Sequence, residues 1–150
     1  MRHKVRVLIL TAALGACGGK DSTAPANPPT IAGTWAFAGS IGNAQLSYSC
    51  VLSGSTLTVN QTGSTFTGVL GSGTMVCTAP GGASVDTTSD SNISAGRISN
   101  GSVSFADQDG CQYSGTISGT PPDRLSGAVT CLIALSGTSY TFTGTWQASR

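Results

Sequence analysis

Cysteine is the residue type with the clearest chemistry in this sequence. The chain of 150 residues has five cysteines, and four of them, Cys50, Cys77, Cys111 and Cys131, follow residue 31. Paired thiols in an exported chain form disulfides, and four thiols with almost no histidine do not suggest a metal site. We therefore expect two disulfides and no bound metal.

Side chains that could act as a general base are scarce. The only histidine is His3, glutamate is absent, and Lys20 is the only lysine after residue 16. A hydroxyl nucleophile normally needs such a base, so we expect no enzymatic activity and no cofactor. Seven basic residues against six acidic ones also give too little positive charge to predict a nucleic-acid partner.

Asp107 and Asp109 have the spacing of the first ligands in a calcium-binding loop. The later ligands of such a loop are missing, and Asp followed by Gly is the ordinary composition of a hairpin turn. We therefore expect a turn at this position. Asp86 and Asp90 lie in a polar stretch, where we expect them to be solvated.

Five aromatic side chains could wall a pocket for a small apolar ligand. They come from widely separated parts of the chain: Trp35, Tyr48, Tyr113, Tyr140 and Trp146. A barrel of about eight strands can hold one small ligand between such side chains. The alternative is that the same residues fill the core, and the sequence leaves both possibilities open.

The first residues have the features of an export signal in the order that precedes a modified cysteine. A basic leader, MRHKVR, is followed by the short apolar run VLILTAAL, and residues 14–17 read LGAC. This segment resembles the lipobox of bacterial lipoproteins. The resemblance implies that residues 1–16 are a cleaved signal peptide and that Cys17 carries diacylglycerol and an N-acyl chain such as palmitate. An ordinary secretory signal with an incidental cysteine is the alternative.

Attachment to a membrane follows from that resemblance. Two or three acyl chains hold a protein on a membrane, whereas one chain anchors it only marginally. Gly18 after the cysteine resembles the outer-membrane sorting pattern, so the expected location is the cell envelope, at the outer membrane. Residues 17–30, which are rich in glycine and proline, are then the lipidated cysteine with a flexible linker, and residues 31–150 are the folded domain.

Beyond residue 30 the sequence predicts strands and turns. Apolar residues occupy alternate positions, the breaks carry Gly, Asn, Asp or Pro, and no segment has helical periodicity. We expect about ten strands, the first over residues 33–37 and the last over 139–147. Residues 80–92, PGGASVDTTSDSN, are a long polar interruption and the only internal segment that we expect to be mobile.

A short glycine-containing pattern recurs four times, in FTGVL, YSGTI, LSGAV and FTGTW. Glycine inside a strand costs about 0.5 to 1 kcal/mol relative to alanine, so its repetition indicates strong curvature or a large side chain opposite. Folding the chain about the turn TPPD places Gly115 opposite Gly127 and Cys111 opposite Cys131. This register predicts a disulfide between Cys111 and Cys131, and by elimination Cys50 joins Cys77.

The same argument predicts that the first and last strands are neighbours. An antiparallel alignment of the two sets Gly33 opposite Trp146 and Trp35 opposite Gly144, so that each tryptophan has a glycine to make room for its indole. A first strand that pairs with the last closes the sheet. The expected fold is an all-β, antiparallel, up-and-down barrel of about eight to ten strands.

This pattern resembles the avidin and lipocalin group of up-and-down barrels. Gly33, Thr34 and Trp35 resemble the opening Gly-x-Trp of those families, and the FTG and LSG segments resemble the glycine-bearing strands of streptavidin. The resemblance implies a barrel that binds a small ligand. The row of tryptophans that walls the biotin site of avidin has no counterpart, so biotin is not implied.

Three functions remain open for such a chain. It could bind a small apolar ligand, it could bind an envelope protein, or it could be a structural component of the envelope. Small envelope inhibitors of lysozyme or proteases are also disulfide-bearing β-barrel lipoproteins. A ligand-binding protein should have a cavity lined by the aromatic residues, and an inhibitor should have a protruding loop, for which residues 80–92 are the candidate.

Overall fold

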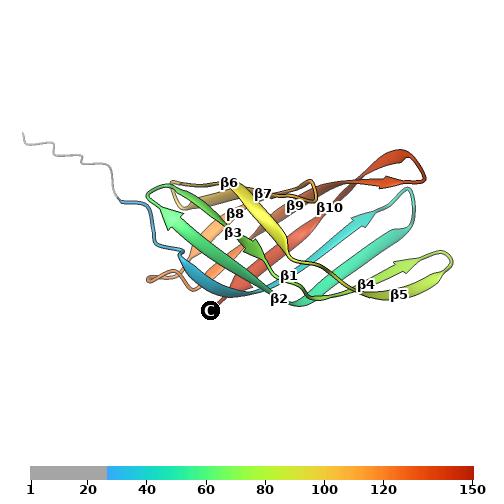
Figure 1. The fold of residues 1–150 in the computed structure, drawn as a ribbon, viewed down its shortest axis with the longest axis horizontal. Coiled ribbons are helices and arrows are strands. Elements are labelled where there is room, and N and C mark those ends of the chain that lie inside the picture. Colours follow the sequence, from blue (N-terminus) through green and yellow to red (C-terminus); the bar gives the residue numbers. More distant parts are fainter. Residues whose placement is uncertain (1–26) are drawn as a thin grey trace, which may run out of the picture.

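The computed structural model describes residues 27–150, in which every regular element is a strand (Figure 1). The expected signal peptide, the lipidation site at Cys17 and most of the expected linker lie outside the described residues. Within the described range no helix is long and apolar enough to cross a membrane. The ten strands are β1 (Gly33–Asn43), β2 (Tyr48–Thr62), β3 (Thr65–Leu70), β4 (Thr74–Ala79), β5 (Gly82–Thr87), β6 (Ser91–Ser99), β7 (Ser102–Asp107), β8 (Cys111–Ser118), β9 (Arg124–Leu135) and β10 (Thr138–Ser149).

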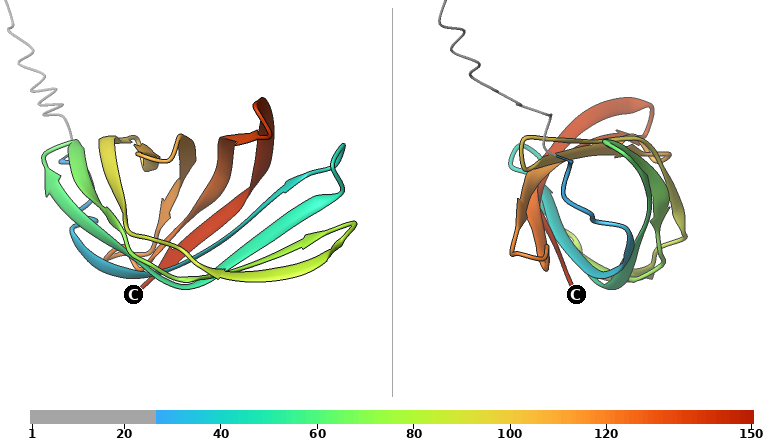
Figure 2. Two further views of the ribbon diagram at one scale, coloured as in Figure 1. Left: turned by 45° about the vertical axis from the view of Figure 1, so that its right-hand side comes forward. Right: turned by 90° about the vertical axis from the view of Figure 1, so that its left-hand side faces the viewer.

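Eight of the strands form a closed antiparallel barrel (Figure 2). Their order around the barrel is β1, β2, β3, β6, β7, β8, β9, β10, which follows the chain, and β10 pairs with β1 to close it. Buried positions alternate with exposed ones, as along β7, where Val103 and Phe105 are buried and Ser102 and Ser104 are exposed. The predicted all-β, up-and-down barrel is confirmed.

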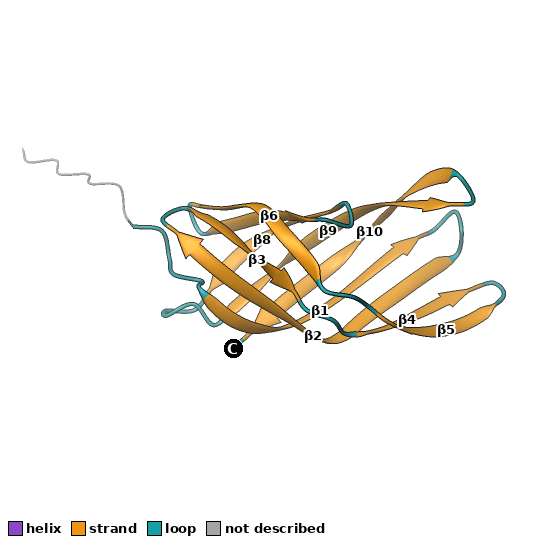
Figure 3. Ribbon diagram, in the orientation of Figure 1, coloured by secondary structure: helices purple, strands orange, loops and turns teal. Residues whose placement is uncertain are grey.

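The other two strands, β4 and β5, extend one side of the barrel as a hairpin. β2 is 15 residues long, and its second half pairs with β3 while its first half, Ser49–Ser53, pairs with β4. β3 and β4 therefore lie end to end along β2. On their other side, β5 pairs with β4 and β6 pairs with β3, so β5 and β6 also lie end to end. Short interruptions at 71–73 and 88–90 separate the two halves of this long hairpin (Figure 3).

The expectation that residues 80–92 are a mobile loop is wrong. Gly82–Thr87 form β5, which pairs with β4 along its whole length. All six residues of β5 are exposed, so the strand has no buried face and leaves no apolar alternation in the sequence. Pairing of its backbone with β4, rather than burial of its side chains, holds β5 in place.

Both expected disulfides are present. Cys111 lies opposite Cys131 in the β8–β9 hairpin, in the register that the sequence predicts. Cys50 lies opposite Cys77 because β4 folds back on the first half of β2. Each disulfide joins directly opposed residues of neighbouring strands, so each one also locks the register of its pair.

The register at the closure of the barrel differs from the predicted one by six residues, because Gly144 lies opposite Ile41 rather than opposite Trp35. Trp35 lies opposite Leu57 of β2, outside the part of β1 that pairs with β10. The prediction failed because several registers of these two strands pair a glycine with a large side chain. The pattern alone does not choose between them.

Gly39 of β1 does lie opposite Trp146 in this register, and glycines on the other side of β10 also make room for the indole. Trp146 lies opposite Gly127 of β9, and a Cβ added to Gly115 of β8 would lie 2.9 Å from Cζ2 of the indole. The Nε1 of the indole donates to the backbone carbonyls of Ala128 and Ser114, at 3.0 and 3.2 Å. The two glycines therefore let the ring lie close to the barrel wall, where its N–H group finds partners.

One end of the barrel is closed by the segment that precedes β1. Ile31 and Trp35 are fully buried there, and Nε1 of Trp35 donates to the carbonyl of Ile31 at 2.9 Å. The guanidinium of Arg150 lies 4.1 Å from the centroid of the Trp35 ring and donates to the carbonyls of Ala32 and Thr30. Figure 2 shows this segment crossing the end of the barrel in its right-hand view. The β1–β2, β4–β5 and β9–β10 hairpins project from the opposite end (Figure 1).

Candidate ligand-binding site

A cavity of about 380 Å³ occupies the interior at the end from which the hairpins project. Its apolar wall includes Ile41, Leu52, Leu70, Met75, Ile133 and Phe142. A second cavity of about 70 Å³ adjoins it on the side of the barrel core and shares six of its lining residues, among them Ile41, Leu52 and Tyr113. The larger cavity falls within the size range of small-ligand sites, and its lining has their apolar character.

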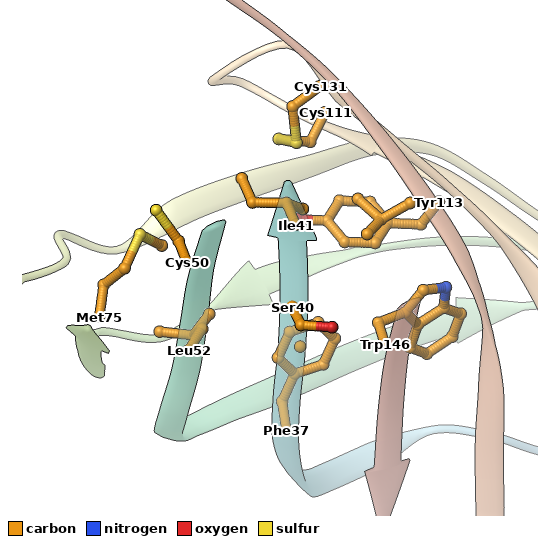
Figure 4. Close-up of a pocket in the computed structure, with 12 residues that line it drawn as sticks. Phe37, Ser40, Ile41, Cys50, Leu52, Met75, Cys111, Tyr113, Cys131 and Trp146 are labelled. Carbon is orange, nitrogen blue, oxygen red and sulfur yellow. A yellow bond between two sulfur atoms is a disulfide. The ribbon is translucent and has the colours of Figure 1, made fainter. Parts of the chain in front are cut away.

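The smaller cavity has an aromatic floor. Figure 4 shows Phe37, Tyr113 and Trp146 gathered on one side of it. Phe37 stacks on Trp146 with ring centroids 5.9 Å apart, and Tyr113 meets Trp146 edge to face at 6.1 Å. Phe105 stacks on Tyr113 at 4.5 Å. These contacts hold the rings in fixed orientations, so that the floor of the smaller cavity is a preformed aromatic surface.

Sulfur lines much of the remaining wall. The Cys50–Cys77 disulfide joins β2 to β4, and the Cys111–Cys131 disulfide joins β8 to β9. Because β2 and β8 are four strands apart in the barrel of eight, the two disulfides lie on opposite walls. Met75, opposite Leu52, extends the wall formed by β2 and β4 (Figure 4). Polarizable sulfur is well suited to contacts with apolar and aromatic groups.

A buried carboxylate lies at the edge of the larger cavity. Asp107 is 8% exposed, and its Oδ1 accepts hydrogen bonds from the backbone N–H groups of Asp109 and Cys111 at 3.0 and 2.8 Å. Its Oδ2 accepts a hydrogen bond from the hydroxyl of Tyr113 at 3.0 Å. The two backbone bonds fold the chain around Asp107 into the hairpin turn that the sequence predicts.

Tyr113 keeps its proton in this environment. Burial raises the pKa of its hydroxyl far above the ordinary value, and the charge of Asp107 and the hydrogen bond to that carboxylate raise it further. The hydroxyl therefore remains a donor over the whole physiological range of pH, and it fixes the orientation of the Asp107 carboxylate.

Ser91 places an unpaired hydroxyl in the wall of the larger cavity. The residue is 3% exposed, and its Oγ has no hydrogen-bond partner among the described residues. It lies on the buried face of β6, two residues before Ile93, which is opposite Asp107. A buried hydroxyl without a partner costs about 1 to 3 kcal/mol, so a ligand group that bonds to Ser91 would be stabilised.

The charged side chains around the larger cavity are acidic. Besides the buried Asp107, the exposed Asp86 of β5 and the exposed Asp109 of the β7–β8 turn line it, so the cavity is open to solvent on this side. The three arginines of the described chain do not line it: Arg97, Arg124 and Arg150.

The structure brings together three of the five aromatic residues that the sequence singles out. Tyr48, Tyr113 and Trp146 line one or both of the cavities. Trp35 does not, because the segment before β1 covers it. Tyr140 is half-buried on β10 and also lies outside both linings.

Sequence reasoning did not single out much of the apolar lining, which includes two phenylalanines as well as aliphatic and sulfur-containing side chains: Phe37, Ile41, Leu52, Met75 and Phe142. Their signal in the sequence is an apolar residue at an alternate position of a strand. Residues that fill the core have the same signal, so alternation alone cannot distinguish a cavity wall from a packed interior.

No protein-family model, no curated protein and no solved structure matches the chain. The geometry of the cavity is therefore the basis for a functional proposal.

Proposed function

We propose that this protein is a non-catalytic lipoprotein of the cell envelope that binds a small, largely apolar ligand at the hairpin end of its barrel. The observation that carries this proposal is the cavity of about 380 Å³, which has aliphatic, aromatic and sulfur-containing walls. The cavity lies inside the barrel wall, opens to solvent at one end and has mainly apolar walls, which is the character of small-ligand sites.

The proposed lipid anchor on Cys17 suits the orientation of this cavity. The chain enters the barrel at the closed end, near Ile31, which is the end opposite the hairpins (Figure 1). The 13 residues between Cys17 and Ile31 reach about 40 Å when extended. The anchor would then join the end of the barrel opposite the cavity and would leave the mouth of the cavity accessible from the aqueous space of the envelope.

The fluorescent probe N-phenyl-1-naphthylamine, which is uncharged at neutral pH and is brightest in apolar surroundings, tests the ligand site. We expect the purified protein to raise its fluorescence in a saturable way. Leu52→Trp should weaken binding at least about tenfold, because the indole occupies volume on the wall that both cavities share.

Val51→Trp is the matched control for this experiment. Val51 is the next residue on the same strand, but it is 54% exposed on the outer face, so its replacement should leave binding unchanged. Equal binding by the two variants, or no binding by the unmodified protein, would contradict a ligand site in the cavity.

Metabolic labelling with a fatty acid tests the proposed anchor. Cys17→Ser removes the sulfur that would carry the lipid, so we expect the variant to incorporate no label and to leave the membrane fraction. Cys50→Ser is a control for the loss of a thiol as such, because Cys50 forms a disulfide inside the barrel. Label in the Cys17→Ser variant equal to that in the unmodified protein would refute lipidation at this position.

The β4–β5 hairpin supports a second candidate function, an interaction module such as an envelope inhibitor. Val51, Val76 and Val85 are 54, 40 and 68% exposed and lie side by side across β2, β4 and β5. Among the described strands β5 pairs only with β4, so its other edge is free to pair with an extended segment. A partner protein that no longer binds Val85→Asp, while the fluorescent probe still does, would favour this function.

A further inference from the structure

We infer that the ligand of the cavity is an apolar molecule that carries a protonated amine, and that an N–H group of this amine bonds to Asp107. The inference rests on the proposed function and specifies the chemistry of the ligand. The amine would lie at the acidic edge of the larger cavity, and the apolar body would lie against the aliphatic and aromatic walls.

Asp107 has an acceptor position left for such a group. The two oxygens of an ionised carboxylate offer about four acceptor positions. The N–H groups of Asp109 and Cys111 use two of these on Oδ1, and the hydroxyl of Tyr113 uses one on Oδ2. One position on Oδ2 therefore remains free of the described residues, and Asp107 is one of the residues that line the cavity.

The carboxylate also lacks a counter-ion among the described residues. Asp107 is 8% exposed, its three bonded donors are uncharged groups, and no described arginine lines the cavity. Buried charges are normally paired, because desolvation of an isolated charge is costly. An ammonium group in the cavity supplies the missing positive charge, whereas an anionic ligand would meet Asp86 and Asp109 as well as Asp107.

Ser91 provides a second contact that does not depend on the acidic residues. Its unpaired Oγ is buried on the same inner face as Asp107, and the two residues are diagonal neighbours on β6 and β7. Diagonal neighbours on paired strands are roughly 7 Å apart. A protonated amine between the two residues has enough N–H groups to donate to Oγ of Ser91 and to Oδ2 of Asp107 at once. An alcohol has a single O–H donor.

Isothermal titration calorimetry with three six-carbon probes tests the inference at pH 7. The probes are hexylammonium, hexan-1-ol and hexanoate, which share one apolar body and differ in the charge of the end group. We expect hexylammonium to bind about tenfold more tightly than hexan-1-ol, since a hydrogen bond to a charged group is worth more than one between neutral groups. Hexanoate should bind most weakly.

Asp107→Asn keeps the size of the side chain and removes its charge, so we expect it to reduce the affinity for hexylammonium about tenfold, to that of hexan-1-ol. Asp123→Asn is the matched control. Asp123 lies in the β8–β9 turn, and its hydrogen bonds to Ser118 and Arg150 are made by its backbone. Asp123→Asn therefore changes the net charge by the same amount as Asp107→Asn, but it should leave the preference for hexylammonium over hexan-1-ol intact. If circular dichroism shows that Asp107→Asn does not fold, the double variant Asp86→Asn with Asp109→Asn should reduce the preference about threefold.

The outcomes separate this inference from the proposed function. Equal affinities for the three probes would overturn the inference that the ligand carries an amine bound to Asp107, while leaving a ligand site in place. A preference for hexylammonium that persists in Asp107→Asn would do the same. Failure of hexylammonium to bind a protein that binds N-phenyl-1-naphthylamine would do the same. Failure of every probe, including the naphthylamine, would overturn both.

Discussion

Gly144→Val is expected to prevent the barrel from closing and to lower the free energy of unfolding by about 3 kcal/mol or more. Gly144 of β10 lies opposite Ile41 of β1, and a Cβ at this position would overlap the backbone carbonyl of Ser40. The backbone of β1 cannot move away from such an atom without losing the pairing with β10 that closes the barrel. Unfolding in denaturant measures the loss.

Gly81→Val is the matched control for Gly144→Val. Gly81 lies at the tip of the β4–β5 hairpin, and a Cβ there would meet nothing within 4 Å. We expect this variant to lie within about 0.5 kcal/mol of the unmodified protein. An equally small effect at Gly144 would show that β1 and β10 do not approach each other as the structure has them.

Two double-mutant cycles distinguish a glycine that faces backbone from one that faces an indole. Gly144→Val and Trp35→Ala should be additive within about 0.5 kcal/mol, because Trp35 is about 20 Å along β1 from the residue opposite Gly144. Gly115→Ala and Trp146→Phe should couple by roughly 0.5 to 3 kcal/mol, since the added Cβ would lie 2.9 Å from the indole. Part of the cost at Gly115 should remain in the double variant, because the Cβ also meets the carbonyl of Ser126.

Removal of the Cys111–Cys131 disulfide is expected to lower the free energy of unfolding by about 3 kcal/mol. The bond closes a loop with a sequence separation of 20 residues, and it lies between two strands of the barrel itself. The double variant Cys111→Ala with Cys131→Ala should therefore lose stability globally, with a lower midpoint of denaturant unfolding.

The Cys50–Cys77 disulfide should have a different, local effect. Among the described strands β4 and β5 join the rest of the sheet only through the pairing of β4 with β2, which this disulfide locks. Its removal should increase hydrogen exchange at amides 74–87 while exchange in β7, β8 and β9 stays slow. The same local increase on removal of Cys111–Cys131 alone would contradict this separation.

The register of strand pairs could be predicted where the partners lie close together in the sequence. In the β8–β9 hairpin a tight turn, two glycines and two cysteines all require one register, so the pairing of Cys111 with Cys131 follows from the order of the residues alone. The closure of the barrel was also predictable, because the first and last strands carry matching patterns. Its register was not, since no turn links β1 to β10 and a shift of six residues keeps the same faces inward.

β5 shows a second limit of sequence reasoning. A strand is recognised by the alternation that one buried face imposes, and β5 has none, because both of its faces are exposed. Only the return of β4 onto β2 creates an edge on which β5 can pair. Such a strand depends on tertiary structure rather than on local pattern.

The candidate site was predictable in the type of its residues more than in their identity. The aromatic residues Tyr48, Tyr113 and Trp146 do line the cavities, but Trp35 is removed from them by the segment that covers it. The burial of Asp107 was not foreseeable, because Asp in an Asp-x-Asp-Gly turn is normally exposed. Its burial follows from the hairpins that extend the barrel wall beyond the turn.

The segment across the closed end makes the barrel a cup rather than a tube. Ile31 and Trp35 fill the interior at that end, so a molecule in the cavity does not pass through the barrel and must leave by the route through which it entered. The proposed ligand would therefore enter and leave at the same end of the barrel, where Asp86, Asp109 and Leu135 lie. Substitutions around Trp35 should accordingly change the free energy of unfolding. Substitutions at the open end should change the rate at which the proposed ligand dissociates.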